Sequence, residues 1–365
     1  MLKSVSTFAL LSQRSANLRA LEADFARTNE EVSSGRKSDV VSAIREDTPA
    51  LMGLRAKYEE NTSYLQSVST FERRSEIMGV AFLNVESALN GIVEHAIVNV
   101  PDAGDSIGTL SLSANAAIEQ IVDALNANFD GRFLFSGVNI ETAPLHRANQ
   151  PSAISGLSPN QVIAAILDGT AYAPAQPPAF TLYTAAEAAT AITRFTEVFD
   201  GVNAGLGPPV DDYSFERSFY NGAIGGALPS IRFNDGAPLS YGATGDDVAF
   251  RNALQGLYML ASVDLNAMAD TPAYEPYVTE ALNRLTMAQD ASRVIHATLG
   301  AVQNTVTERK TALEIENIVA VNQINAYELI DPIEVQSRFA EIEKQLDAAY
   351  AATVRASRLR LTNYL

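Results

Sequence analysis

The chain contains three histidines, and histidine is the side chain best suited to acid–base catalysis and metal binding near neutral pH. His95, His146 and His296 lie far apart, and none has the spacing of a metal-binding pair such as His-x-x-x-His. Cysteine is absent from the sequence, which excludes disulfides, thiol catalysis and cysteine-ligated metal. We therefore expect each histidine to be a surface or partly buried polar residue.

Two acidic pairs and two glycine clusters are the remaining candidates for chemistry. Asp211-Asp212 and Asp246-Asp247 could bind calcium or serve acid–base catalysis, but their spacing matches no calcium loop. Asp246-Asp247 stands where a helix cap belongs. Gly225-Gly226 and the pair Gly131 and Gly137 lack the flanking residues of a phosphate-binding loop. These features predict caps and turns, and we expect no catalytic residue, no cofactor and no metal site.

Composition limits the classes of partner. The chain has 365 residues, 47% of them hydrophobic, which is enough for a sizeable core in two or three domains. Its net charge of −17 and pI near 4.6 disfavour nucleic acid and anionic membranes as partners. The sequence has no run of roughly twenty apolar residues, so we expect no membrane insertion. The segment after Lys3 also lacks the apolar block of a cleaved secretory signal.

Narrow apolar stripes at both ends of the chain are the strongest pattern. Near the start, apolar residues recur every seven positions, at Leu11, Leu18, Phe25 and Val32. Near the end, a four-three spacing runs through Val335, Phe339, Ile342 and Leu346, with Tyr350 close by and Tyr364 and Leu365 closing the chain. Such stripes are typical of coiled-coil seams, which need a partner helix. Because none is near in sequence, we expect the two ends to meet each other or other copies of the chain.

The stripes belong to a chain whose flanks are helical. Caps, prolines and apolar periodicity predict helices over 2–32, 49–100, 106–128, 275–329 and the segment after Pro332. The middle differs, because ten of the fifteen prolines lie between Pro144 and Pro238. There we expect short strands at 180–183 and 230–233, the second in a hairpin with 238–241.

These expectations define a mainly α fold with an inserted part. The N- and C-terminal flanks form long, antiparallel, coiled-coil-like helices, and the insert is a small β-containing domain, either α+β or mainly β. We expect a terminal domain of 1–45 plus 320–365, a long-helix domain of 46–140 plus 246–319, and an insert over 141–245.

Four short motifs stand out along the flanks. They are Gly131-Arg132-Phe133-Leu134-Phe135-Ser136-Gly137, the ending 361–365, the loop 33–36 and the helix entry 46–50. Together they resemble the flagellin superfamily, and most closely its hook–filament junction proteins, the hook-associated protein 3 (FlgL) family. The motifs cover both flanks and leave the insert unmatched. Two features depart from the junction proteins: Thr48 stands where they usually have an acid, and the insert is longer than in compact members.

The resemblance implies a structural, non-enzymatic subunit of the bacterial flagellum. Its partners would be copies of itself, an adjacent hook-associated protein on the hook side, flagellin on the filament side and a flagellar export chaperone. It would be extracellular at the hook–filament junction, exported by the type III route without a cleaved signal peptide. Two alternatives stay open at this point: flagellin itself, and a ligand-binding or enzymatic insert carried on a helical stalk.

Overall fold

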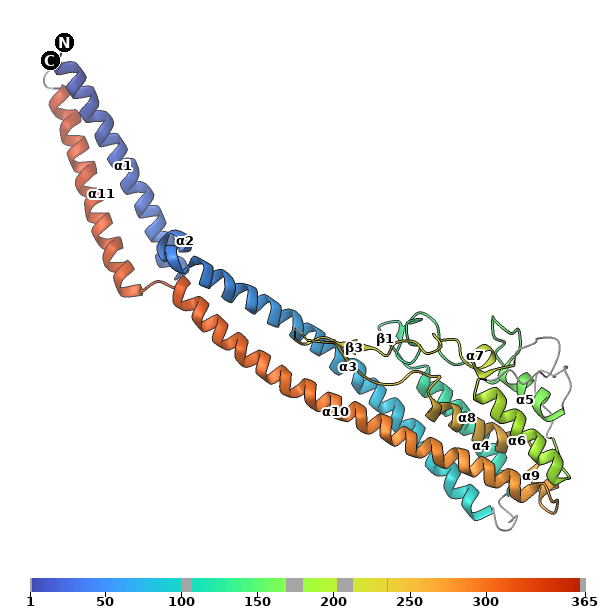
Figure 1. Cartoon of the computed structure of the whole chain (residues 1–365). Helices are drawn as coiled ribbons and strands as arrows, with labels where there is room; N and C mark the ends of the chain where they lie inside the picture. The colour runs from blue at the N-terminus through green and yellow to red at the C-terminus, as the bar shows by residue number, and fades with distance from the viewer. Residues whose placement is uncertain (1, 100–106, 169–179, 202–212, 235, 362–365) are drawn as a thin grey trace. The chain divides into compact units, whose positions relative to one another are not determined.

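The computed structural model describes residues 2–99, 107–168, 180–201, 213–234 and 236–361, and the side chains of 2–11, 99, 107 and 356–361 lie outside that description. The chain divides into two compact units (Figure 1). Unit 1 comprises residues 1–63 and 312–365, and unit 2 comprises residues 64–311. Two long helices, α3 (Thr48–Asn99) and α10 (Tyr274–Glu328), contribute residues to both units.

Unit 1 is built only from helices in the part that the structure describes. Besides the first turns of α3 and the last turns of α10, it contains α1 (Leu2–Ser34), α2 (Val40–Ile44), a short 3-10 turn (Arg45–Asp47) and α11 (Pro332–Leu361). Proline begins α11 in its first turn and follows Thr48 at the start of α3, as its fixed φ angle favours at a helix start.

Unit 2 holds the main core, where α3 and α10 pack with α4 (Ile107–Leu125) and α8 (Val248–Ala261). The four-three positions of α3 are all buried. They are Met78, Phe82, Val85, Leu89, Ile92 and Ala96. A second set in α10, Leu299, Val302 and Val306, is also buried. The sequence periodicity therefore fixes which face of each long helix enters the core.

The remaining elements of unit 2 are short. They are the hairpin β1 (Asn128–Phe129) and β2 (Arg132–Phe133), α5 (Pro159–Asp168), α6 (Ala185–Phe199), α7 (Phe215–Ser218), the hairpin β3 (Ser230–Ile231) and β4 (Leu239–Ser240), and α9 (Leu265–Met268). The expected mainly α fold with a small β-containing part is confirmed.

The insert differs from the sequence expectation in two respects. Its described residues contain three helices, α5, α6 and α7, where mostly strands and loops were expected. The strand expected at 180–183 is wrong: Phe180 makes only an isolated parallel bridge with Val263. The strand expected at 230–233 is present but shorter. Buried aromatic rings of Phe195, Phe199 and Phe219 supply the packing that strands would otherwise provide.

The helical stretch 40–98 resembles a membrane span by length and composition alone. Among the described residues, the helical stretch 40–98 contains a window of 18 residues with mean hydropathy 1.2, which is long and apolar enough to cross a bilayer by length and composition. That window is 44% buried inside the protein, and core helices of proteins outside membranes give the same signal. Phe82 and Leu89 of α3 lie in the core, as expected for a core helix. The absence of membrane insertion stays a prediction.

Candidate assembly site

The two terminal helices, α1 and α11, lie side by side and run antiparallel in unit 1 (Figure 1). The rings of Phe25 and Phe339 meet with centroids 4.9 Å apart. Further toward the chain ends, the Tyr350 hydroxyl donates a hydrogen bond to Glu22 Oε1 at 2.8 Å. This bond to a carboxylate raises the pKa of Tyr350. Residues about 310 to 330 positions apart in sequence are thus neighbours in space.

The α11 side of this pair follows the four-three spacing. Val335 is buried, and Phe339, Ile342 and Leu346 are each half-buried. Half-burial along a seam means that α1 covers only part of each apolar side chain. A helix pair of this kind leaves apolar surface that a further helix could cover.

The α1 side follows the spacing less closely. Leu18 and Phe25 are half-buried, but Val32 is 38% exposed and Thr28 and Glu31 occupy the most covered positions. Near the end of α1 the covered residue is Glu31 instead of Val32, because the loop that carries Ser38 and Arg338 of α11 both contact the Glu31 carboxylate.

Three residues predicted for this interface cannot be placed. Tyr364 and Leu365 lie outside the described residues, and so does the side chain of Leu11. Their role at the interface stays a prediction.

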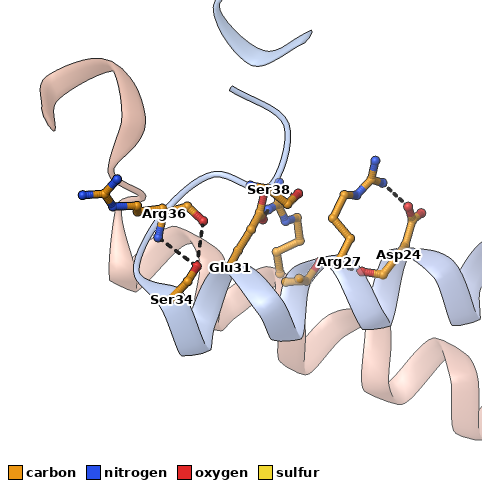
Figure 2. A network of polar contacts seen from close by, with 8 residues as sticks. Asp24, Arg27, Glu31, Ser34, Arg36 and Ser38 are labelled. Atoms are coloured by element: carbon orange, nitrogen blue, oxygen red, sulfur yellow. Dashed lines mark hydrogen bonds and ion pairs between the residues drawn. The ribbon is translucent and has the colours of Figure 1, made fainter. Parts of the chain in front are cut away.

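Glu31 is a residue that sequence reasoning missed. It is 7% exposed, and its Oε1 accepts hydrogen bonds from the backbone N and the Oγ of Ser38, both at 3.1 Å. Its Oε2 forms an ion pair with Arg338 of α11. Figure 2 shows Glu31 between α1 and the loop that carries Ser38. One buried carboxylate therefore ties α1, the following loop and α11 together. The only signal in the sequence is an acid placed at the edge of an apolar stripe.

The loop after α1 contains one of the motifs behind the family resemblance, Ser33-Ser34-Gly35-Arg36. Gly35 adopts a φ of +70°, and its backbone N donates to Glu31 O at 2.9 Å, which ends the helix in a left-handed cap. The Arg36 backbone N donates to Ser34 Oγ at 3.2 Å (Figure 2). The motif is therefore a helix stop followed by a tight turn.

A second buried acid, Glu328, fixes the same loop to the end of α10. It is 5% exposed and accepts from Arg36 Nη1 at 3.1 Å and from Arg55 Nε at 3.0 Å. Lys37 adds two bonds, from its backbone N to Glu328 O at 2.9 Å and from Nζ to Tyr327 O at 2.8 Å. The loop, the first turns of α3 and the last turn of α10 are thus joined around one carboxylate.

Unit 1 leaves many apolar side chains uncovered. Ile333 at the start of α11 is 81% exposed, and Val354 near its end is 50% exposed. The others among the described residues are Val32, Val41, Met52, Ile315, Ile318, Val319, Val321, Leu329 and Tyr350. Scattered exposed apolar residues are normal, but so many in a small helical unit are the pattern expected of an interaction surface.

The motif at 131–137 lies in unit 2 and has a structural role. Asp130 and Gly131, with φ of 54° and 73°, form the two-residue turn between β1 and β2, a geometry typical of a type I′ hairpin. Leu134 and Phe135 are buried, and the Phe135 ring packs edge-on against Phe82 at 5.6 Å. Phe133 is half-buried and Arg132 is exposed, while Gly137 has φ of 64°. The motif anchors the hairpin on α3.

The other candidates for chemistry are scattered. His296 Nδ1 lies 3.1 Å from Glu86 Oε1, His146 is buried, and His95 is exposed. Asp247 caps α8 by accepting from Ala249 N at 2.9 Å, which confirms the expected cap. Asp211-Asp212 lies outside the described residues. Across the described part of the chain, no group of three or more potential metal ligands comes together.

Comparison with known proteins gives similarity in fold only. No protein-family model matches the chain, and no curated protein does. A solved structure from Vibrio parahaemolyticus, described as a flagellar hook-associated protein, is 10% identical, with 78% of this chain and 99% of that chain covered and a TM-score of 0.49. FlgL from Bacillus cereus is 13% identical, with 76% and 99% covered and a TM-score of 0.44. At these identities and TM-scores, neither similarity carries an argument about function.

Proposed function

We propose that this protein is a structural subunit of the bacterial flagellum that assembles through its paired terminal helices. The observation that carries the proposal is the half-covered seam between α1 and α11. Phe25 and Phe339 meet within one chain, yet Ile333, Tyr350 and Val354 of the same helix pair remain exposed. A seam with this much uncovered apolar surface is stabilised when further helices pack on it.

Within the flagellum, we propose the role of the hook–filament junction adaptor. The support is the sequence resemblance of the motifs at 131–137, 33–36 and 46–50. Its partners would be copies of itself, a neighbouring hook-associated protein, flagellin and an export chaperone, and it would lie outside the cell. Flagellin is the second candidate for the same architecture. The number of copies per flagellum separates the two, because a junction is one short ring and a filament contains many more subunits.

The rival from another class, an enzymatic or ligand-binding insert, is not favoured by the described part of the insert. Its interior is occupied by stacked aromatic rings, with Phe199 and Phe219 4.9 Å apart and Phe215 and Phe219 5.5 Å apart. Rings packed in this way stabilise a fold. The pocket at the edge of the insert, lined by Asn139, Glu141, Thr142 and Asn221 among others, is open to solvent. A structural, non-enzymatic role for the insert is therefore part of the proposal.

The test is the substitution Phe339→Asp. A charge at this position would be buried against Phe25 when helices pack around the seam, which costs several kcal/mol. We expect the variant to be exported but to give no flagellar assembly and no swimming in a strain lacking the native chain. The matched control is Ile154→Asp, because Ile154 is an exposed apolar residue of the insert. Normal swimming with Phe339→Asp would contradict the proposed role of the terminal helices.

A further inference from the structure

Unit 2 carries a concentration of basic residues that the assembly seam does not use. Six side chains, hereafter the basic patch, come from α3, α10 and the two hairpins. They are Arg73, Arg74, Arg132, Arg232, Arg309 and Lys310. They make up half of the lysines and arginines of unit 2, in a chain whose net charge is −17. Such clustering in an acidic protein calls for a physical explanation.

Contacts in the structure bring these residues together. The guanidinium carbons of Arg73 and Arg74 lie 5.8 Å and 6.0 Å from the centre of the Phe129 ring in β1. Arg132 pairs with Phe129 across the hairpin, so its side chain leaves the same face. Two arginines thus lie over one aromatic ring, and a third leaves the same face of the hairpin beside it. The ring face attracts cations, but the arrangement still places like charges close together.

The second hairpin and α10 supply the remaining residues of the basic patch. Arg309 of α10 donates from Nε to Phe233 O at 3.4 Å, next to exposed Arg232. Lys310 forms an ion pair with Glu72 at 2.9 Å, which joins this group to Arg73. Four described carboxylates belong to the same segments: Glu72, and the exposed Glu76, Asp130 and Glu308. Positive charge therefore exceeds negative charge locally.

The opposite end of unit 2 has the reverse character. Segments 90–120 and 252–283 contain no lysine or arginine. They meet around α9, where Ser111 Oγ donates to Ala261 O at 3.0 Å. Here lie Asp264, Asp270 and Glu275, hereafter the acidic end, of which Asp270 and Glu275 are exposed. Figure 1 shows α9 at one end of α10 and the hairpins farther along it. At a helical rise of 1.5 Å per residue, Glu275 and Lys310 are roughly 50 Å apart.

We propose that the basic patch of one copy docks on the acidic end of a second copy, so that neighbouring unit 2 domains associate head to tail. This rests on the proposed function of the chain as an assembling subunit. For neighbours that run parallel, charge complementarity selects this register, because parallel neighbours at the same level would place like charges opposite each other. A head-to-tail contact uses two different surfaces of each copy, so it builds a ring or a helical array instead of a closed dimer. Neighbours are then displaced along the helix axis by roughly 50 Å.

The experiment reverses each surface separately and then both together in the full chain. Arg132→Glu with Arg232→Glu reverses the basic patch at its exposed members, and Asp270→Lys with Glu275→Lys reverses the acidic end. The matched control is Lys57→Glu with Arg293→Glu. Both residues are exposed, lie outside the basic patch and the acidic end, and pair with an acid three positions away on the same helix. Self-association is measured by sedimentation velocity, and folding by circular dichroism.

For the native chain, we expect the association constant to fall about tenfold or more between about 50 mM and about 300 mM salt. Each reversal alone should weaken association about tenfold or more at the lower salt, and the chain with both reversals should recover to within about threefold of the native value. The control should stay within about threefold.

Three results would overturn the proposal. They are equal weakening by the control and by the basic-patch reversal, no recovery when both surfaces are reversed, or no self-association of the native chain at low salt. Retention on a polyanionic resin without self-association would instead indicate an acidic partner other than this chain. Phe339→Asp keeps the two proposals separate, because it tests the seam without altering either charged surface.

Discussion

At the scale of single residues, two buried acids organise unit 1. Glu31 connects the loop after α1 to Arg338 of α11, and Glu328 connects the same loop to Arg55 of α3. Neither role can be read from the sequence, because the partners of Glu328 lie 273 and 292 positions away. The apolar spacing at Val335 and Phe339 is visible without a structure, because periodicity is a local signal. Long-range polar pairs leave no such signal in one sequence.

His146 gives a prediction about pH. It is 7% exposed, its backbone N donates to Phe219 O at 2.9 Å, and its Nε2 has no hydrogen-bond partner among the described residues. Burial lowers the pKa of His146 below its ordinary value. Because the unfolded chain binds this proton more readily than the folded one, the histidine destabilises the fold as pH falls below the unfolded pKa of about 6.5.

We therefore expect His146→Gln to reduce the loss of thermal stability between about pH 7.5 and about pH 5.5 relative to the native chain. The measurement is the pair of melting curves at each pH, in which the effects of other titrating groups cancel in the difference. His95→Gln is the matched control, because His95 is exposed. Identical pH dependence for the native chain and His146→Gln would show that this histidine is not held neutral by burial.

At the scale of elements, the ends of the helices are set by a few positions with special backbone geometry. Gly35 adopts a φ of +70° at the end of α1, and a Cβ added there would meet nothing within 4 Å. A side chain at this position therefore costs backbone strain alone. Gly53 lies inside α3, also with nothing within 4 Å of an added Cβ and without a positive φ.

These two glycines predict opposite effects of the same substitution. Gly35→Ala should lower the free energy of unfolding by about 1 kcal/mol, because alanine disfavours the left-handed conformation. Gly53→Ala should raise it by about 0.5–1 kcal/mol, because alanine is the better residue in a helix interior. Chemical denaturation of both variants provides the measurement. Equal signs for the two substitutions would contradict the cap at Gly35.

The insert shows where element prediction failed and why. The chain segment around 180–183 has strand-like composition, but α6 begins directly after it with a capping box formed by Thr184 and Glu187. That Thr-x-x-Glu signal is present in the sequence and marks a helix start. The many prolines of the insert favour strands and loops over helices, which conceals this helix signal. The long helices α3 and α10 were easier to predict, because proline-free periodic segments of such length have few alternatives.

At the scale of the whole molecule, the sequence predicts the mainly α class and a division into three parts. The structure has two compact units, with boundaries within α3 and α10. The three-part division expected from the sequence stays a prediction, as does the role of the predicted seam residues in assembly. Unit 1 supplies the half-covered helix pair, and unit 2 supplies a charge distribution with opposite signs at its two ends. Both properties are expected of a subunit that packs among copies of itself.

The most direct test of the central claim, that the two ends of one chain pair in the assembly, is cross-linking between α1 and α11. The chain has no cysteine, so Glu22→Cys with Tyr350→Cys introduces the only two thiols, at side chains that are in contact. A short bifunctional maleimide is added to the assembled protein, made from a mixture of isotope-labelled and unlabelled chains, with each single variant as control. We predict cross-links within single chains in high yield. Cross-links exclusively between chains, or none, would contradict the account.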